Sequence, residues 1–397
     1  MSSTIKNIVI PDVIIPEGLP GAGRGDLLIR DGIVAALRPG PEGTAPRCVI
    51  PALVEAHCHL DKCHTIDRMT RIGGDLVAAI TAQRQDKVNW SADDLRHRMR
   101  CGLRELRDAG CALVRSHIDW SETATPPVAW SVLGELATDS GLTVDRAALI
   151  NMAMLADPTL NRDLARQVAR MGGTLGTFVF DQPERRAGVR AAFDLAERFG
   201  LMLDFHVDEG LAEGLNGLEL IADVALETGF QGPVLCGHAC SLMNHRDPAL
   251  SRLLDKIAAS GVFVAALPTS NLYLQGRDSG TPDRRGITRL RELRNAGVPV
   301  VIGSDNVADA FCPVGQHDPM AALHLAILTA HLDPPLERWL PAITTNAARA
   351  LGREPTEVIG ASVADLRISD AATPSELISG RAGRLRPLLP DAGAVAA

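Results

Sequence analysis

The stretch from Val54 to Thr65, VEAHCHLDKCHT, concentrates histidines, cysteines and a lysine in one short segment. A step of two residues along a strand returns side chains to the same face, so His57 and His59 are expected to point together and Cys58 away from them. Neutral imidazole nitrogens are common ligands of zinc and iron, and the pair therefore favours a metal site. On these residues alone, two polar side chains at a strand end remain the alternative.

The eight cysteines offer a second chemistry, in which a thiol acts as metal ligand or nucleophile. They are scattered along the chain without a CxxC pair, and reduced thiols are expected in a long chain without an export signal. Cys58 faces away from the histidine pair, and Cys63 lies beyond the predicted strand. A hydrolase with Cys58 or Cys63 as its nucleophile is therefore a minor alternative to the metal site.

The overall composition excludes several kinds of partner. The chain has 397 residues, a net charge of −8, 3% aromatic residues and a single tyrosine. Nucleic-acid binding calls for a basic surface or base-stacking aromatic residues, and neither is present in quantity. The N-terminus lacks the pattern of a signal peptide, and no apolar run of about 18 residues predicts a membrane span. We expect a cytoplasmic protein with no nucleic-acid or membrane partner.

The elements that must position these residues follow an alternating pattern. Helical stretches such as residues 92–110 and 183–200 separate apolar runs, which predicts a (β/α)8 barrel, an α/β fold, over residues 51–353. A doubly wound open sheet competes, but no GxGxxG follows a first strand. Both chain ends read as β-rich, so residues 1–50 and 354–397 are expected to share a small β-sandwich. The predicted barrel strands are residues 50–59, 111–119, 147–155, 173–180, 201–209, 234–240, 262–271 and 298–306.

Reactive side chains recur at the ends of these predicted strands. Catalytic residues of such barrels sit at the C-terminal ends of the strands. Five of the 11 histidines fall there, and acidic residues accompany them, which strengthens the prediction of a metal site. The strand-end residues are His57, His59, His117, His206, Asp208, Glu209, His238, Asp305 and Asn306. The six other histidines lie in predicted loops or helices and are expected at the surface: His64, His97, His245, His317, His324 and His331.

The motifs HCHLDK, DFHVDEG, GHA and GSDN, in this order, resemble those of the amidohydrolase superfamily, in particular its cytosine deaminase-like branch. The segment from Asn271 to Gly315, with NLYLQGR and RRGIT, is closely similar to one in bacterial cytosine deaminases. The SDN and HxDK details also resemble N-isopropylammelide hydrolase. The motifs are specific as a set and weak singly.

This resemblance implies one divalent metal ion, zinc or iron, because the predicted fourth strand carries no lysine that could bridge a second ion. It also implies a terminal β-sandwich and a role for each strand-end residue. The implied ligands are His57, His59, His206 and Asp305, while His238 would hold the hydroxide and Glu209 would transfer protons. The chemistry is coherent by itself, since a divalent metal lowers the pKa of water to about 7 and a non-ligand carboxylate can move protons.

The substrate-binding residues depart from the resemblance. Cytosine deaminases have a glutamine at the end of the third strand, where this chain places Met154, or Asn151 or Met152 if the alignment shifts. A methionine cannot make paired amide hydrogen bonds. Asn306 stands where the branch has a second aspartate, and Phe311 where it has a tryptophan. Lys62 and His117 are further candidates for substrate contact. For His117, a packing position behind the metal ligands is an equally good interpretation.

The sequence therefore predicts a metal-dependent deaminase of a small nitrogen heterocycle, such as a pyrimidine, an isocytosine- or creatinine-like ring, a triazine or a pterin. Hydrolysis of a cyclic amide or an N-alkylamine is the alternative within the same superfamily. A metal-binding barrel without catalysis is the alternative from another class, and it would not need Glu209. The size of the barrel and the tendency of the family suggest a homo-oligomer.

Overall fold

The computed structural model describes residues 2–14, 23–40, 46–70, 72–120, 125–277, 280–282, 284 and 286–389. Its larger sheet has eight parallel strands, each paired with its neighbours along the chain. A bridge between Cys58 and Asp305 joins the first strand to the segment after the last, and the Asp305 amide donates to the His57 carbonyl at 2.9 Å. The predicted barrel is thus confirmed. Its strands are β5 (Leu53–Cys58), β6 (Cys111–Asp119), β7 (Thr143–Ile150), β8 (Thr174–Val179), β9 (Leu203–Val207), β10 (Val234–His238), β11 (Phe263–Ala266) and β12 (Val300–Ile302).

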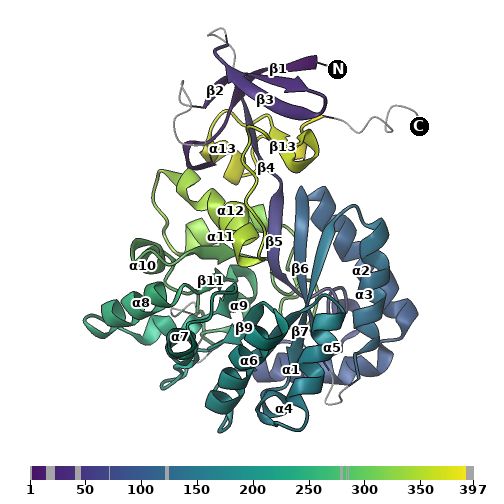
Figure 1. Ribbon diagram of the computed structural model, residues 1–397, viewed down its shortest axis with the longest axis vertical. Coiled ribbons are helices and arrows are strands. Elements are labelled where there is room, and N and C mark those ends of the chain that lie inside the picture. Colours follow the sequence, from purple (N-terminus) through teal and green to yellow (C-terminus); the bar gives the residue numbers. More distant parts are fainter. Residues whose placement is uncertain are drawn as a thin grey trace.

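Helices alternate with these strands and surround them (Figure 1). Every residue of β5, β9 and β10 is buried, as expected for parallel strands that are covered on both faces. None of the helices in the described ranges combines the length and apolarity that a membrane crossing requires. The helices are α1 (Leu76–Asp86), α2 (Ala92–Asp108), α3 (Val128–Asp139), α4 (Met152–Ala156), α5 (Asn161–Arg170), α6 (Arg185–Phe199), α7 (Gly217–Thr228), α8 (Ala249–Ser260), α9 (Pro268–Leu274), α10 (Leu290–Asn295), α11 (Pro319–Thr329), α12 (Thr345–Ala350) and α13 (Pro374–Ile378).

The two predicted helices have clear local signals. The Ser91 hydroxyl accepts a hydrogen bond from the Asp94 amide and caps α2, which satisfies one of the free N–H groups at the helix start. The apolar stripe of α6 faces the barrel, and the helix ends where Gly200 takes a left-handed φ of 65°, a conformation that glycine adopts without steric cost.

Several predicted strands are too long at their C-terminal ends, the third and seventh by five residues and the eighth by four. The third was expected to reach Leu155, but β7 ends at Ile150 and the Asn151 side chain accepts from the Ala153 amide to start α4. The seventh was expected to reach Asn271, but Pro268 occupies the first turn of α9. Proline fits a helix start and asparagine is a strong helix cap, so local capping overrode the apolar run in both places.

Both chain ends contribute to one six-stranded sheet next to the barrel, at the top of Figure 1. β4 lies parallel to β1 and antiparallel to β13, so the first and last parts of the chain are joined. The described residues of the two chain ends form this one sheet, and residues 1, 15–22, 41–45 and 390–397 lie outside them. The strands, in sheet order, are β14 (Arg386–Pro387), β13 (Leu366–Ser369), β4 (Arg47–Pro51), β1 (Ser2–Val9), β2 (Arg24–Arg30) and β3 (Ile33–Arg38).

Asp208, which directly follows β9, fixes the start of α7. Its side chain accepts hydrogen bonds from the amides of Gly217 and Leu218, at 2.9 and 3.1 Å, and from the Ser241 hydroxyl at 3.0 Å. The carboxylate is buried, so water could not readily replace it as the acceptor for these three donors. Asp208 is therefore a structural residue of the β9–α7 connection.

Replacing Asp208 with alanine is expected to lower the free energy of unfolding by about 2–3 kcal/mol, because buried donors would lose a charged acceptor. Urea denaturation measures the change. Asp194→Ala is the matched control, since this exposed carboxylate pairs with Arg190 on the surface of α6, and it is expected to shift stability by no more than about 1 kcal/mol. Equal losses of unfolding free energy in Asp208→Ala and Asp194→Ala would contradict the structural role of Asp208.

Candidate metal centre and active site

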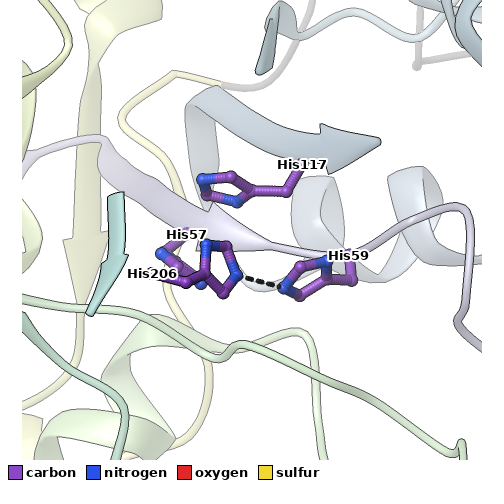
Figure 2. Close-up of side chains that lie close together, drawn as sticks. All are labelled: His57, His59, His117 and His206. Carbon is purple, nitrogen blue, oxygen red and sulfur yellow. Dashed lines mark hydrogen bonds between the residues drawn. The ribbon is translucent and has the colours of Figure 1, made fainter. Parts of the chain in front are cut away.

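Four imidazoles and one carboxylate converge at the C-terminal end of the barrel. His57 and His59 come from the end of β5, His117 from β6 and His206 from β9, and Figure 2 shows their rings gathered together. The potential ligand atoms of these four histidines lie within 4.8 Å of one another, and the same holds for those of His57, His238 and Asp305. The two-residue spacing predicted that His57 and His59 point together. In the structure, residues from distant strands lie beside this pair.

The distances suit a single divalent ion. His59 Nε2 lies 3.1 Å from His206 Nε2 and 3.3 Å from Asp305 Oδ1, and His57 Nε2 lies 3.5 Å from the same oxygen. Ligand atoms 2.0–2.1 Å from a tetrahedral zinc ion are separated by about 3.3 Å. Within the described residues, both ring nitrogens of His57 and Asp305 Oδ1 lack a hydrogen-bond partner, which leaves them available for coordination.

The protonation states are also those that ligands need. Burial lowers the pKa of His59 and of His206 well below the usual value, so both rings are neutral. Burial opposes the charge on Asp305, but the imidazoles of His57 and His59 beside it hold the pKa of this carboxyl well below the ordinary range. Neutral imidazoles with one carboxylate form a donor set for zinc or iron(II).

Backbone strain accompanies this geometry. His238 and Asp305 have φ values of 71° and 60°, a left-handed conformation that is uncommon for residues other than glycine. Such strain persists where the surrounding structure enforces it, often at functional sites. Glu55 supplies part of that enforcement, since its buried carboxylate accepts from the amides of His57 and Ser304 at 3.0 Å each.

Glu209 and His238 lie beside the histidine cluster. Glu209 Oε2 is 3.6 Å from His238 Nε2, and burial together with the charge of Asp305 raises the pKa of Glu209 well above its ordinary value. The Asn271 amide donates to His238 Nδ1 at 3.0 Å, which orients Nε2 toward Glu209. The arrangement places a carboxyl group that can hold a proton next to the metal-binding residues without making it one of them.

His117 lies behind the cluster. Its ring centroid is 4.1 Å from that of His57, and its Nε2 is 2.9 Å from Asp204, which also pairs with Arg115 at 3.2 Å. All of these side chains are fully buried. His117 is not among the described residues that line the cavity of the next paragraph. Its contacts are those of a residue that supports His57. Substrate contact was the other of its two predicted roles.

A cavity of about 530 Å³ opens beside the cluster. Three of the predicted substrate residues line it: Lys62, Asn306 and Phe311. Met154 is not in the described lining, but Asn151 is. The described lining consists of His59, Lys62, Leu76, Ile80, Gln83, Arg84, Lys87, Asp119, Trp120, Leu149, Asn151, Phe178, Phe180, Gln182, His206, Glu209, His238, Asn306 and Phe311.

Lys62 connects the metal-binding residues with the cavity wall. Its ammonium is 2.8 Å from Asp119 Oδ1 and 3.3 Å from His59 Nδ1, and it lies 5.3 Å from the centre of the Phe311 ring. Burial favours the neutral amine, but the charges of Asp119 and Asp61 outweigh it and raise the pKa of Lys62. Lys62 is therefore a charged residue that Asp119 holds between His59 and the cavity wall.

Sequence reasoning missed several residues of the site. Ser270 donates to Asp305 and Asn271 to His238, and both lie at the end of the predicted seventh strand, where the same strand-end rule would have found them. The cavity wall from α1 carried no local signal. His317 was expected at the surface, but it is buried and its Nδ1 is 2.8 Å from Glu105.

The described structure disfavours a thiol mechanism. Cys58 and Cys63 are fully buried, and burial raises the pKa of both thiols well above the ordinary value. Each thiol donates to a backbone carbonyl, Cys58 to that of Arg115 and Cys63 to that of Leu60. A nucleophile must be available as thiolate, so these cysteines are packing residues.

The barrel, the buried donor set and the adjacent acid define a metal-dependent barrel hydrolase. A model of the amidohydrolase family matches residues 75–361. The chain is 34% identical over 394 residues to a pterin deaminase of Rhizobium rhizogenes, covering 94% of this chain and 90% of that protein. The chain belongs to the amidohydrolase family.

Two further relatives cover most of the chain. N-isopropylammelide isopropyl amidohydrolase of Pseudomonas sp. is 25% identical over 354 residues, with 85% of this chain and 83% of the relative covered. The crystal structure of 5-methylcytosine deaminase from Klebsiella pneumoniae, liganded with phosphonocytosine, superposes with a TM-score of 0.82 at 26% identity. It covers 96% of this chain and 95% of that one. The family predicted from the strand-end motifs is therefore confirmed.

Removal of the metal is expected to lower the thermal unfolding temperature, and addition of Zn²⁺ or Fe²⁺ to restore it, because an ion that binds the folded chain stabilises it. Thermal scans of chelated and reloaded protein measure this. Asp305→Asn should lose most of the metal-dependent rise. His97→Asn, at an exposed position of α2, should keep it. A melting temperature that is unaffected by chelation and reloading would contradict the metal site.

Proposed function

We propose that this protein is a metal-dependent aminohydrolase that removes the 2-amino group of a pterin-type ring and releases ammonia. The observation that carries the proposal is the position of Glu209. It is an acid 3.6 Å from His238, in the lining of the same cavity as His59 and His206. Hydrolysis of a C–NH2 bond requires a group that moves protons beside the attacking water, and Glu209 meets that requirement.

His57, His59, His206 and Asp305 would hold the divalent ion. When bound, the ion would supply hydroxide near neutral pH, because it lowers the pKa of water to about 7. Glu209 receives a proton from the water and passes it to the ring nitrogen next to the reacting carbon. His238 Nε2, oriented by Asn271, donates to the oxygen that is added to that carbon.

Collapse of the tetrahedral carbon breaks the C–NH2 bond. The added hydroxyl group becomes the new carbonyl and gives its proton to Glu209, which delivers it to the departing nitrogen, and this nitrogen leaves as ammonia. One water is consumed, and a 2-amino-4-oxopteridine becomes the 2,4-dioxo compound. No atom is oxidised or reduced in these steps.

The cavity supports a bicyclic ring over a single one. Its volume of about 530 Å³ lies within the range of sites for small organic ligands. Trp120, Phe178 and Phe180 provide apolar walls for a flat ring, and no glutamine follows β7 to select a pyrimidone. The Rhizobium rhizogenes relative with 34% identity is a pterin deaminase, which agrees with this choice.

Hydrolysis of an N-alkylamine substituent is the second candidate. It is favoured by the Pseudomonas relative, an isopropyl amidohydrolase that aligns with 85% of this chain. The two candidates differ in the amine that leaves. Release of isopropylamine from N-isopropylammelide, with no ammonia from pterins, would select the second.

Metal-loaded protein is expected to release ammonia from 2-amino-4-oxopteridine, and Glu209→Gln to lower that rate at least about 10²-fold, because the proton carrier is lost. An ammonia assay with parallel metal analysis measures both. Glu213→Gln, an exposed position four residues along, should keep the wild-type rate. A Glu209→Gln enzyme that turns over normally with its metal bound would refute the role of Glu209.

A further inference from the structure

The inner face of α1 forms one wall of the cavity. Leu76, Ile80 and Gln83 line it, and their spacing of four and three residues places them on one side of the helix. Ala79 on this side packs with Phe311 and Leu274, which fixes the helix against α9 and the loop that follows β12. The position of Gln83 in the cavity wall is therefore set by the apolar packing of Ala79, one turn before it.

Gln83 is a buried amide without a partner. Its side chain is 2% exposed, and neither Nε2 nor Oε1 has a hydrogen-bond partner among the described residues. Asp86, one turn further along α1, is fully engaged by Arg68, Asn89 and Trp90. Buried polar groups without partners are rare and costly to folding, so an unsatisfied amide in a cavity wall points to a ligand.

The other amides that line the cavity are engaged. Asn151 accepts from the Ala153 amide at 2.9 Å, and Asn306 donates to Asp309 at 2.6 Å. Gln182 uses both atoms, since Oε1 accepts from the Phe180 amide and Nε2 donates to the Phe178 carbonyl. Of the four amide side chains in the described lining, Gln83 is the one with both its donor and its acceptor unused.

We propose that Gln83 determines specificity by binding the lactam edge of the ring. An amide side chain offers one acceptor and one donor side by side, and the N3–H and C4=O groups of a 4-oxopteridine require that pair. Oε1 would accept from N3–H and Nε2 would donate to O4, next to the reacting carbon. The inference rests on the proposed function, because it assigns the contact that selects the substrate of the same site.

The test compares wild type, Gln83→Leu and Gln83→Glu with 2-amino-4-oxopteridine, as kcat/KM for ammonia release and as Kd from pteridine fluorescence. Gln83→Leu is expected to lower kcat/KM and to raise Kd, each at least about 10²-fold, because both ring groups lose their partners. Gln83→Glu lacks the donor for O4. It should lose affinity for this compound by at least about 10-fold, because a carboxylate oxygen would face O4 in place of a donor.

Two controls separate binding from a structural role. Gln85→Leu changes an exposed glutamine on the opposite side of α1 and should leave kcat/KM and Kd at wild-type values. Gln83→Leu should keep its metal and unfold at the wild-type temperature or above, because it removes an unsatisfied amide. A lowered unfolding temperature with loss of metal would overturn the proposal in favour of a structural glutamine.

The two proposals fail separately. Wild-type protein that binds the pteridine without releasing ammonia refutes the proposed function, and the Kd of the variants then still decides the role of Gln83. An unchanged Kd and kcat/KM in Gln83→Leu overturns the role of Gln83 and leaves the function intact. Wild-type protein that neither binds nor converts the compound refutes both.

Discussion

The buried charge of Asp305 is the constraint on which the site depends. A carboxylate without access to water is costly unless charges or donors compensate it. Here two imidazoles and the Ser270 hydroxyl surround it, and a divalent ion would complete the compensation. Neutral rings and an adjacent acid of raised pKa follow from concentrating these groups in a buried site.

The same region closes the barrel. The Asp305 amide bonds to the His57 carbonyl, and Glu55 binds amides on both sides of the seam between the first and last strands. The hydrogen bonds that join these strands are therefore made by residues within two positions of proposed ligands. Stability of the barrel end and occupancy of the metal site are coupled through this seam.

The sequence predicted the parts that depend on local periodicity. Apolar runs located all eight strands, and polar residues at their ends located the histidines and the aspartate that the structure brings together, because parallel strands in a barrel end on the same side. Met154 falls outside the described cavity lining, since Asn151 caps a short helix where the strand was extended. Gln83 was missed because nothing in the sequence of α1 distinguishes its cavity face from its solvent face. That distinction arises when α1 packs on Phe311, a residue more than 200 positions away.

The seam between His57 and Asp305 also has a consequence for biosynthesis. The two residues stand at opposite ends of the barrel sequence, so a nascent chain has His57 and His59 outside the ribosome long before Asp305 is made. Partial chains offer an ion an incomplete set of ligands, and full coordination must await the last strand. Coordination of a divalent ion by all four proposed ligands would therefore require a chain whose barrel has been completed.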